Sequence, residues 1–131
     1  MIKKANALIW IKRAESNLAR ASAGRTDEKI LYEDLCFDCQ QAVEKSLKAL
    51  LALHDKETVI THSIGLLINN ISDTIGMDIP GFVNESVILT DYAVQTRYPG
   101  FYEPVTEADY QTALHLASQV LDWVKKIIEN N

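Results

Sequence analysis

The segment DYAVQTRYPGFYEP, residues 91–104, gathers one arginine, four aromatic residues and two prolines. Arg97 carries a planar fork of donors that suits a phosphate, and the rings of Tyr92 and Tyr98 could stack on a base or on the guanidinium. Pro99 stiffens the backbone, and Gly100 permits a tight turn or the close approach of a ligand. These residue types predict a nucleotide-binding loop.

A structural interpretation of the same segment is equally well supported by the residues alone. Aromatic residues and prolines often pack a loop against the end of a helical bundle, and an arginine can donate to the last carbonyls of a helix. The segment by itself leaves both interpretations open.

The cysteines and histidines are weaker candidates. Cys36 and Cys39 would supply at most two ligands from one helical face, whereas a closed zinc site needs four, so we interpret them as buried small side chains. His62, in Thr61-His62-Ser63, stands where a helix begins, and taken alone it favours a capping or loop role over binding. His115 is expected on the surface.

Common enzyme signatures are missing from the chain. It has no glycine-rich phosphate loop, G-x-S-x-G elbow, H-E-x-x-H pair or paired catalytic carboxylates. We therefore predict no catalytic residue, no metal and no cofactor, and we assign Trp10, Tyr110 and Trp123 to packing.

Length and charge restrict the function classes further. The 131 residues with 47% hydrophobic content predict one domain, residues 1–131. A net charge of −5 and a pI of about 5.1 argue against duplex DNA or long RNA, but allow a mononucleotide or a short RNA end. Charges such as Lys3, Lys4 and Lys12 interrupt the N-terminal apolar positions, which argues against a signal peptide or membrane span and predicts a cytoplasmic protein.

Apolar periodicity predicts helices only. A first helix should end near Gly24, and a second, N-capped by Thr26 or Asp27, should continue to about Leu53. Thr61 or Ser63 should cap a third helix, which Gly76 ends.

A fourth helix should begin near Pro80 and stop before Pro99, and a last one should open on the pair Thr106 and Asp109. No segment alternates as a strand does. The predicted fold is all-α, an antiparallel up-and-down bundle of four to five helices.

Two apolar residues lie off the main stripe of the second helix. Phe37 and Leu51 share a face with the polar Gln41, Glu44 and Lys48, so something else must cover them. Another helix of the same bundle and a dimer seam explain this equally well.

Three segments together carry a family resemblance. LYEDLCFDCQQAVEKSLKALL (31–51), THSIGLL (61–67) and TDYAVQTRYPG (90–100) resemble, in this order, the HEPN family, named for a nucleotide-binding domain of higher eukaryotes and prokaryotes. Trp10, Ala14 and Leu18 also match an N-terminal pattern of the family. The combination of QQAVEK, THS and RYP is what makes the resemblance specific.

The resemblance implies an antiparallel helical bundle that forms a homodimer. Family members often work beside a small nucleotidyltransferase, as its substrate-binding subunit or as half of a toxin–antitoxin pair. Many relatives are metal-independent RNases with an arginine followed four to six residues later by a histidine. After Arg97 the corresponding residues here are Tyr102, Glu103 and Pro104, so this RNase activity is not carried over.

What the resemblance carries over is an expected binding set, which we combine with Tyr92 from the first segment. Its members come from QQAVEK, THS and RYP, and are Gln41, Lys45, His62, Ser63, Arg97, Tyr98 and Pro99. Gln41 and Lys45 are four residues apart and share a helical face. We expect a non-catalytic protein that binds a nucleotide or presents substrate to a nucleotidyltransferase. The alternatives are an RNase toxin in which His62 supplies the imidazole, and a structural dimerisation module.

Overall fold

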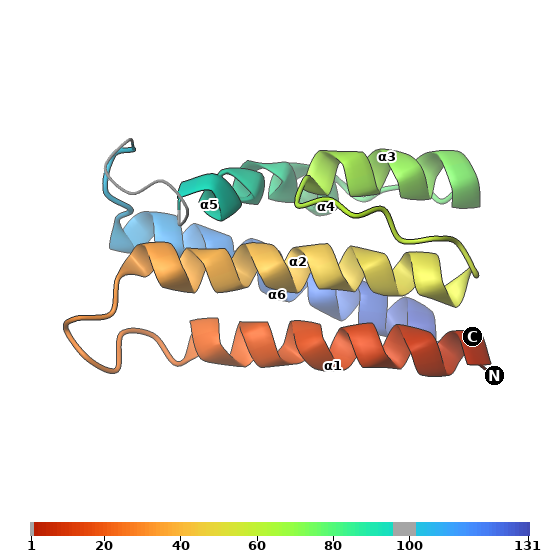
Figure 1. Cartoon of the computed structure of the whole chain (residues 1–131), viewed down its shortest axis with the longest axis horizontal. Helices are drawn as coiled ribbons and strands as arrows, with labels where there is room; N and C mark the ends of the chain where they lie inside the picture. The colour runs from red at the N-terminus through yellow and green to blue at the C-terminus, as the bar shows by residue number, and fades with distance from the viewer. Residues whose placement is uncertain (1, 96–101) are drawn as a thin grey trace.

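The computed structural model describes residues 2–95 and 102–131, and within these ranges every regular element is a helix (Figure 1). The predicted all-α class is therefore confirmed. None of the described helices is long and apolar enough to cross a lipid bilayer. The elements are α1 (Ile2–Ser22), α2 (Tyr32–Leu53), α3 (Ile64–Ile75), α4 (Gly81–Glu85), the 3-10 helix η1 (Ser86–Leu89), α5 (Thr90–Gln95) and α6 (Glu107–Glu129).

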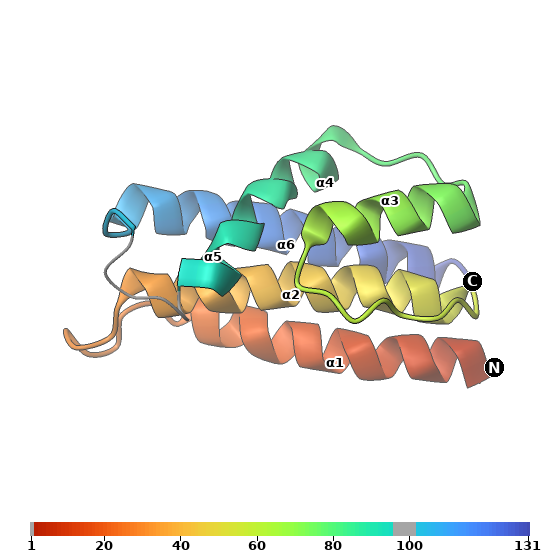
Figure 2. The ribbon, with the colours of Figure 1, turned by 45° about the horizontal axis from the view of Figure 1, so that its top comes forward.

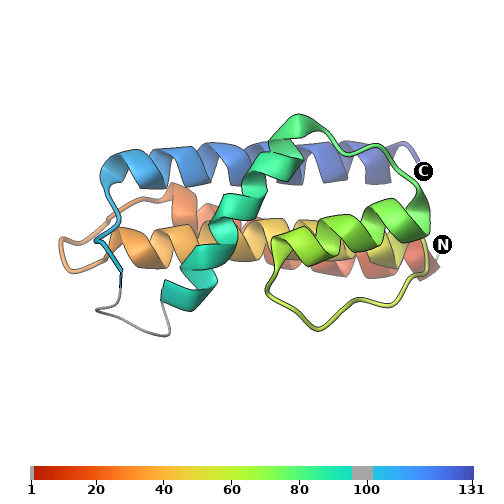
Figure 3. The same ribbon diagram turned by 90° about the horizontal axis from the view of Figure 1, so that it is seen from above.

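Helix α2 lies at the centre of the bundle. The chain turns back between α1 and α2, which run antiparallel, whereas α6 runs in the same direction as α2 (Figure 1). A second layer, made of α3 and the bent run α4–η1–α5, crosses over α2 and α6 (Figure 3). Because α1, α3, α5, η1 and α6 all pack on α2, this helix is enclosed on most sides.

This central position settles what covers Leu51 within a single chain. Leu51 is fully buried and Phe37 is half-buried without any second copy of the chain. The Leu51 side chain is therefore covered by other helices of the same bundle, which is one of the two interpretations of the sequence. The homodimer does not follow from this face and stays a prediction.

The predicted start of the second helix is wrong. Helix α2 begins at Tyr32, and its N-cap residue Leu31 makes no side-chain cap. The side chain of Asp27 instead accepts a hydrogen bond from the Lys29 amide, 2.8 Å away. Asp27 closes a local turn, a use of aspartate that competes with helix capping, and the helix starts five residues later.

A tight turn ends α2 and begins a helix-free connection that leads to α3. The amide of Lys56 donates to the Leu51 carbonyl at 2.8 Å, and the amide of Asp55 donates to the Ala52 carbonyl at 3.1 Å. Asp55 has a φ of 57°, so the pair of bonds forms a Schellman motif with aspartate in the left-handed position. The motif sends the chain back along α2.

Helix α3 begins and ends where the sequence predicts. The Ser63 hydroxyl accepts from the Leu66 amide at 3.2 Å, which makes Ser63 the N-cap, and Gly76 ends the helix with a φ of 74°. Pro80 stands at the N-cap of α4, near the predicted start of the fourth helix.

The run from α4 to α5 is bent rather than straight. At the junction, the buried Ser86 hydroxyl donates to the Val83 carbonyl at 2.5 Å. Such a local side-chain bond competes with the regular helical ladder, and the backbone follows a 3-10 course from Ser86 to Leu89. The bend lets the run pass diagonally over both α2 and α6 (Figure 3).

Helix α6 begins with the predicted capping box, in which Thr106 and Asp109 bond each other's backbone amides. One turn further on, Tyr110 is buried, and its hydroxyl donates to the carbonyl of Ala21 at 2.5 Å. The Ala21 carbonyl lies in the last turn of α1, where helices lack internal donors, and it accepts from both Tyr110 and the Gly24 amide. The bond from Tyr110 joins two helices that are distant in sequence.

Replacing Tyr110 with phenylalanine tests this bond. Tyr110→Phe keeps the ring and removes one of the two donors to the Ala21 carbonyl, since the Gly24 amide still donates at 3.2 Å. We therefore expect a loss of about 0.5–1.5 kcal/mol in the free energy of unfolding. Urea denaturation followed by circular dichroism measures it. The control is Tyr102→Phe on an exposed ring, which should change little. Equal effects in both variants would contradict the assigned role.

Candidate functional site

A buried carboxylate organises the polar face of α2. The Glu44 side chain is only 4% exposed, and both of its oxygens accept hydrogen bonds. Oε1 accepts from Lys48 Nζ at 2.8 Å. Oε2 accepts from the side-chain amides of Gln40 and Gln41, each at 3.0 Å, and lies 3.2 Å from His62 Nδ1.

The donors around Glu44 decide its charge. Burial opposes ionisation of this carboxyl, but the hydrogen bonds from Lys48, His62 and Gln40 outweigh it, so the pKa of Glu44 lies below its ordinary value. Glu44 is therefore ionised near neutral pH. Gln40, which is fully buried, also donates to the His62 carbonyl at 3.0 Å and so fixes the connection against α2.

A second polar chain links α2 to α1. The buried Asn17 amide donates to Asp38 Oδ1 at 2.9 Å, while its oxygen accepts from Lys45 Nζ at 2.7 Å. Arg20 Nη2 lies 2.5 Å from the same Asp38 oxygen, and its Nε donates to the other at 3.3 Å. Asp38, Asn17 and Lys45 are thereby held in one fixed row.

The environment of Lys45 is unusual for a lysine. Burial lowers its pKa, Glu44 and Asp38 oppose that effect, and the nearby cations Arg13 and Arg20 add to it, so the pKa lies below the ordinary lysine value. Lys45 is half-buried and fixed by Asn17. A lysine held in this way is a pre-positioned donor for an anion.

Of the predicted binding residues, Gln41, Lys45 and His62 lie on this face of the bundle. Gln41 and Lys45 share the face as expected, but Gln41 is tied to Glu44 and Gln40, whereas Lys45 reaches Asn17 on α1. The His62 side chain is 49% exposed, so it is accessible from solvent while Glu44 orients its ring.

Ser63 and Tyr92 lie close by in supporting positions. The Ser63 hydroxyl caps α3, and the half-buried Tyr92 hydroxyl is hydrogen-bonded to the Cys36 thiol on α2. Burial raises the pKa of Tyr92 above its ordinary value. Arg97, Tyr98 and Pro99 lie outside the described residues, so their part of the prediction stays a prediction.

The three segments that are distant in sequence meet on α2. The Ile64 amide, at the start of α3, donates to the Thr90 hydroxyl at the start of α5, 3.2 Å away. Helix α5 then packs against α2, as Figure 2 shows. The QQAVEK, THS and TDYAVQ segments therefore lie together on one face of the bundle.

Sequence reasoning missed Glu44, Asn17 and Asp38 as members of the site. One signal for Asn17 was available: it falls at a core position of α1, between Ala14 and Ala21 at steps of three and four, where an apolar residue is expected. A polar residue at such a position needs a buried partner, which here is Asp38. No local pattern identifies that partner.

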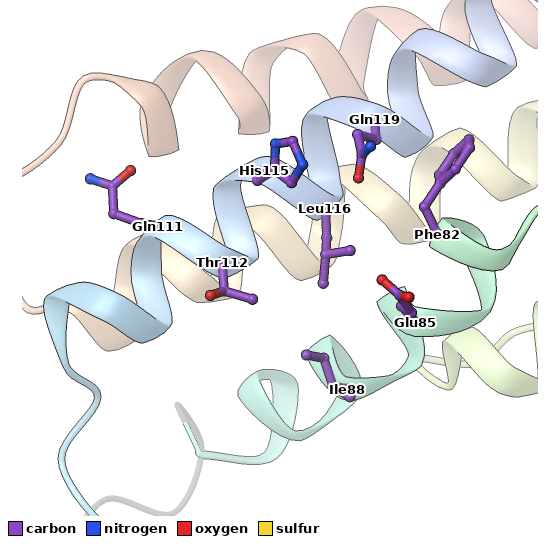
Figure 4. A pocket seen from close by; sticks show the side chains of 8 residues that line it. All are labelled: Phe82, Glu85, Ile88, Gln111, Thr112, His115, Leu116 and Gln119. Atoms are coloured by element: carbon purple, nitrogen blue, oxygen red, sulfur yellow. The ribbon is translucent and has the colours of Figure 1, made fainter.

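Two of the clefts at the surface of the described residues are large enough to hold a small molecule. One, of about 450 Å³, opens between α1 and the connection after α2, and Trp10, Arg13, Lys45 and Lys56 are in its lining. The other, of about 740 Å³, separates α4 and η1 from α6 (Figure 4). Its lining holds no lysine or arginine, and its charged or titratable members are Glu85 and His115. Only the smaller of these two clefts adjoins the polar face of α2.

The cysteines do not contribute a reactive group. Cys36 and Cys39 are free and fully buried, and burial raises the pKa of both thiols to about 12. Neither is a thiolate near neutral pH, so neither is a nucleophile. In the described ranges, no three His, Cys, Asp or Glu side chains are grouped to hold a metal ion.

Fold and site together define a small all-α domain whose central helix carries a buried polar network on one face. The model of the HEPN domain family matches residues 7–127, and the chain belongs to this family. Among curated proteins, no significant match was found.

Two solved structures are similar over nearly their whole length. A crystal structure of ST0689, described as an archaeal HEPN homologue, is 30% identical, with a TM-score of 0.73 over 93% of this chain and 97% of its own. The crystal structure of TT1696 from Thermus thermophilus is also 30% identical, with a TM-score of 0.77 over 96% of this chain and 98% of its own. The comparison with ST0689 supports the family assignment, and the comparison with TT1696 supports the fold.

The isosteric change Glu44→Gln tests the importance of the buried charge. The glutamine removes the negative charge and puts an NH2 group where one carboxylate oxygen now accepts hydrogen bonds. We therefore expect a loss of about 1.5–3 kcal/mol in the free energy of unfolding at pH 7. Because the pKa of Glu44 is lowered in the folded state, its contribution is present above the unfolded value of about 4.3 and is lost as pH falls.

The stability difference between Glu44→Gln and the wild type should therefore shrink from pH 6 to pH 3. Thermal and urea denaturation across this range measure it, with the exposed Glu57→Gln as control. A difference that stays constant down to pH 3 would show that the charge of Glu44 is not what stabilises the fold.

Proposed function

We propose that this HEPN domain binds a nucleotide or a short RNA end on the polar face of α2, without cleaving it, and presents it to a partner nucleotidyltransferase. The carrying observation is the meeting of the separate QQAVEK and THS segments at the Glu44 carboxylate, beside α5. A buried charged network is costly to assemble, and functional sites are where proteins keep such networks.

The residue types of this face and of the 91–104 segment suit a nucleotide. Lys45 and Arg97 are donors for phosphate, and His62 and the tyrosine rings of the 91–104 segment could contact a base. The chain as a whole carries a charge of −5, so a small anionic ligand fits better than a long polyanion. We further propose a homodimer and a toxin–antitoxin-like pairing, which rest on the family.

Calorimetric titration with ATP, GTP and short RNAs tests binding, and Arg97→Ala tests the loop. Arg97→Ala should weaken binding by about 1.5–3 kcal/mol, the value of a charge-assisted contact. Arg25→Ala, an exposed arginine outside the three segments, should leave affinity unchanged. Absence of heat with every ligand, both with and without a nucleotidyltransferase, would refute the proposal.

The same samples separate binding from a purely structural role. If Arg97 only closes the bundle, Arg97→Ala should lower the melting temperature strongly, and no ligand-dependent shift would exist to be lost. Sedimentation of these samples also measures whether the 14.7 kDa chain is a dimer.

A second candidate function is RNA cleavage with His62 as the general base. The observation that favours it is the pairing of His62 Nδ1 with the ionised Glu44, because a carboxylate that orients the ring prepares the other nitrogen to take a proton. In this reaction His62 would take the proton of the RNA 2′-hydroxyl, whose oxygen attacks the adjacent phosphorus and displaces the 5′-oxygen.

Incubation of the purified protein with a defined RNA tests cleavage. If His62 is the base, His62→Ala should reduce the rate by at least about 100-fold. The control His115→Ala, on the exposed face of α6, should leave the rate unchanged. Equal absence of cleavage in the wild type and both variants would refute His62-dependent cleavage.

A further inference from the structure

The cleft between α1 and the connection after α2 has an unusual concentration of positive charge for this chain. Arg13 comes from α1, Lys45 from α2 and Lys56 from the connection, and Asp55 is the acidic residue in the lining. The lining thus has a net charge of +2 in a protein whose net charge is −5. None of these residues except Lys45 belongs to the segments that carry the family resemblance.

The size and the walls of this cleft suit part of a nucleotide. Its volume of about 450 Å³ lies within the range of small-molecule sites. Trp10 forms one wall with a half-buried indole, which offers a stacking surface for a base. Ala52 and Ile9 add apolar surface beside it.

Local structure fixes the Lys45 ammonium and the backbone of Lys56. Asn17 holds Lys45 Nζ at 2.7 Å, and the Schellman motif bonds the Lys56 amide to the Leu51 carbonyl at 2.8 Å. The backbone beneath Lys56 is therefore set by the end of α2. A binding group on a fixed backbone loses less entropy when it meets a ligand than one on a free chain.

The cleft is connected to the Glu44 network. Lys48 Nζ, which bonds Glu44, lies 5.5 Å from the centre of the Trp10 ring. Lys45 follows Glu44 in sequence and lines the cleft itself. A ligand could therefore contact the cleft and the polar face of α2 at the same time.

We infer that this cleft is a phosphate-binding subsite, in which Arg13, Lys45 and Lys56 bind the oligophosphate of a nucleotide or consecutive phosphates of an RNA strand. This inference rests on the proposed function, and it assigns the phosphates of the nucleotide or RNA to this cleft. The larger cleft is a poor alternative for phosphate, because its lining holds no lysine or arginine.

The first experiment removes the two cations that lie outside the family segments. Arg13→Ala and Lys56→Ala should each weaken binding of inorganic triphosphate and of ATP by about threefold to tenfold, because each loses one charge-assisted contact at a partly exposed position. Lys126→Ala removes the same charge from the exposed face of α6 and should change affinity by less than about twofold.

Asp55→Gly is the most informative variant, because it should strengthen triphosphate binding while leaving the turn intact. Glycine adopts the positive φ of this position at least as well as aspartate, so the turn should remain. Removal of the carboxylate should tighten triphosphate binding by about threefold to tenfold. If Asp55 has only a turn-forming role, affinity stays unchanged, and the inference is contradicted.

Trp10 supplies a local readout. Triphosphate and ATP should change its fluorescence, and Trp10→Phe should abolish the change while the signal of Trp123, elsewhere on α6, remains. A short RNA with a terminal triphosphate, the same RNA with a terminal hydroxyl, and ATP distinguish the two sources of phosphate. If the RNA with a terminal hydroxyl binds more weakly than the RNA with a terminal triphosphate, the cleft binds an oligophosphate. If both RNAs bind equally well, and the slope of log affinity against log salt concentration falls by about 0.7 for each cation removed, the cleft binds the strand.

The outcomes separate this inference from the proposed function. If ATP or RNA binds and neither Arg13→Ala nor Lys56→Ala weakens it, the ligand lies elsewhere: the inference fails and the proposed function stands. If triphosphate, ATP and both RNAs all fail to bind, both are refuted. Weaker binding in the two cation variants, together with tighter binding in Asp55→Gly, supports the subsite.

Discussion

An ionised carboxylate inside the bundle is the constraint on which the arrangement of the site depends. A buried charge is strongly unfavourable unless charged and neutral donors surround it, and Glu44 has Lys48, His62, Gln40 and Gln41 in that role. The donors come both from α2 and from the connection that follows it. The connection must therefore pass beside Glu44, which fixes where α3 begins and, through Thr90, where α5 begins.

The same requirement gives α2 two different functions. Its apolar stripe holds the bundle together, since α1 and α6 pack on it. The side chains of its polar stripe form hydrogen bonds with residues of α1 and of the connection after α2. Asp38 and Lys45 belong to the row that reaches α1, and Glu44 belongs to the row that reaches His62. Mutually satisfied polar rows in an interior favour one helix register over others. We therefore regard α2 as the element that positions every described residue of the site.

The sequence predicted the parts of the fold that are encoded locally. The capping box of α6 and the glycine at the end of α3 are short patterns with a direct backbone consequence, and both predictions are confirmed. Of the two residues predicted to cap α3, Thr61 and Ser63, Ser63 is the N-cap. The start of α2 was predicted wrongly, because Asp27 can cap a helix or close a turn and only tertiary packing decides between them.

The site was predictable only in part, for a related reason. The family resemblance located Gln41, Lys45 and His62, but the buried partners Asn17 and Asp38 are 21 residues apart and meet only because α1 and α2 pack antiparallel. The cations Arg13 and Lys56 are likewise distant in sequence. Pairings of this kind depend on helix register, which no short motif contains.

The arrangement around Glu44 also bears on whether binding or cleavage is the function. Both require an anion beside His62 and Lys45, so the positive cleft nearby supports them equally. Cleavage needs, in addition, a 2′-oxygen in line with the phosphorus and the leaving 5′-oxygen, and a nitrogen within hydrogen-bond reach of the 2′-hydroxyl proton. Binding needs charge complementarity and shape, and the positively charged cleft between α1 and the connection after α2 is the feature that supports it. Binding therefore requires less precise geometry than cleavage, and for this reason we propose it first.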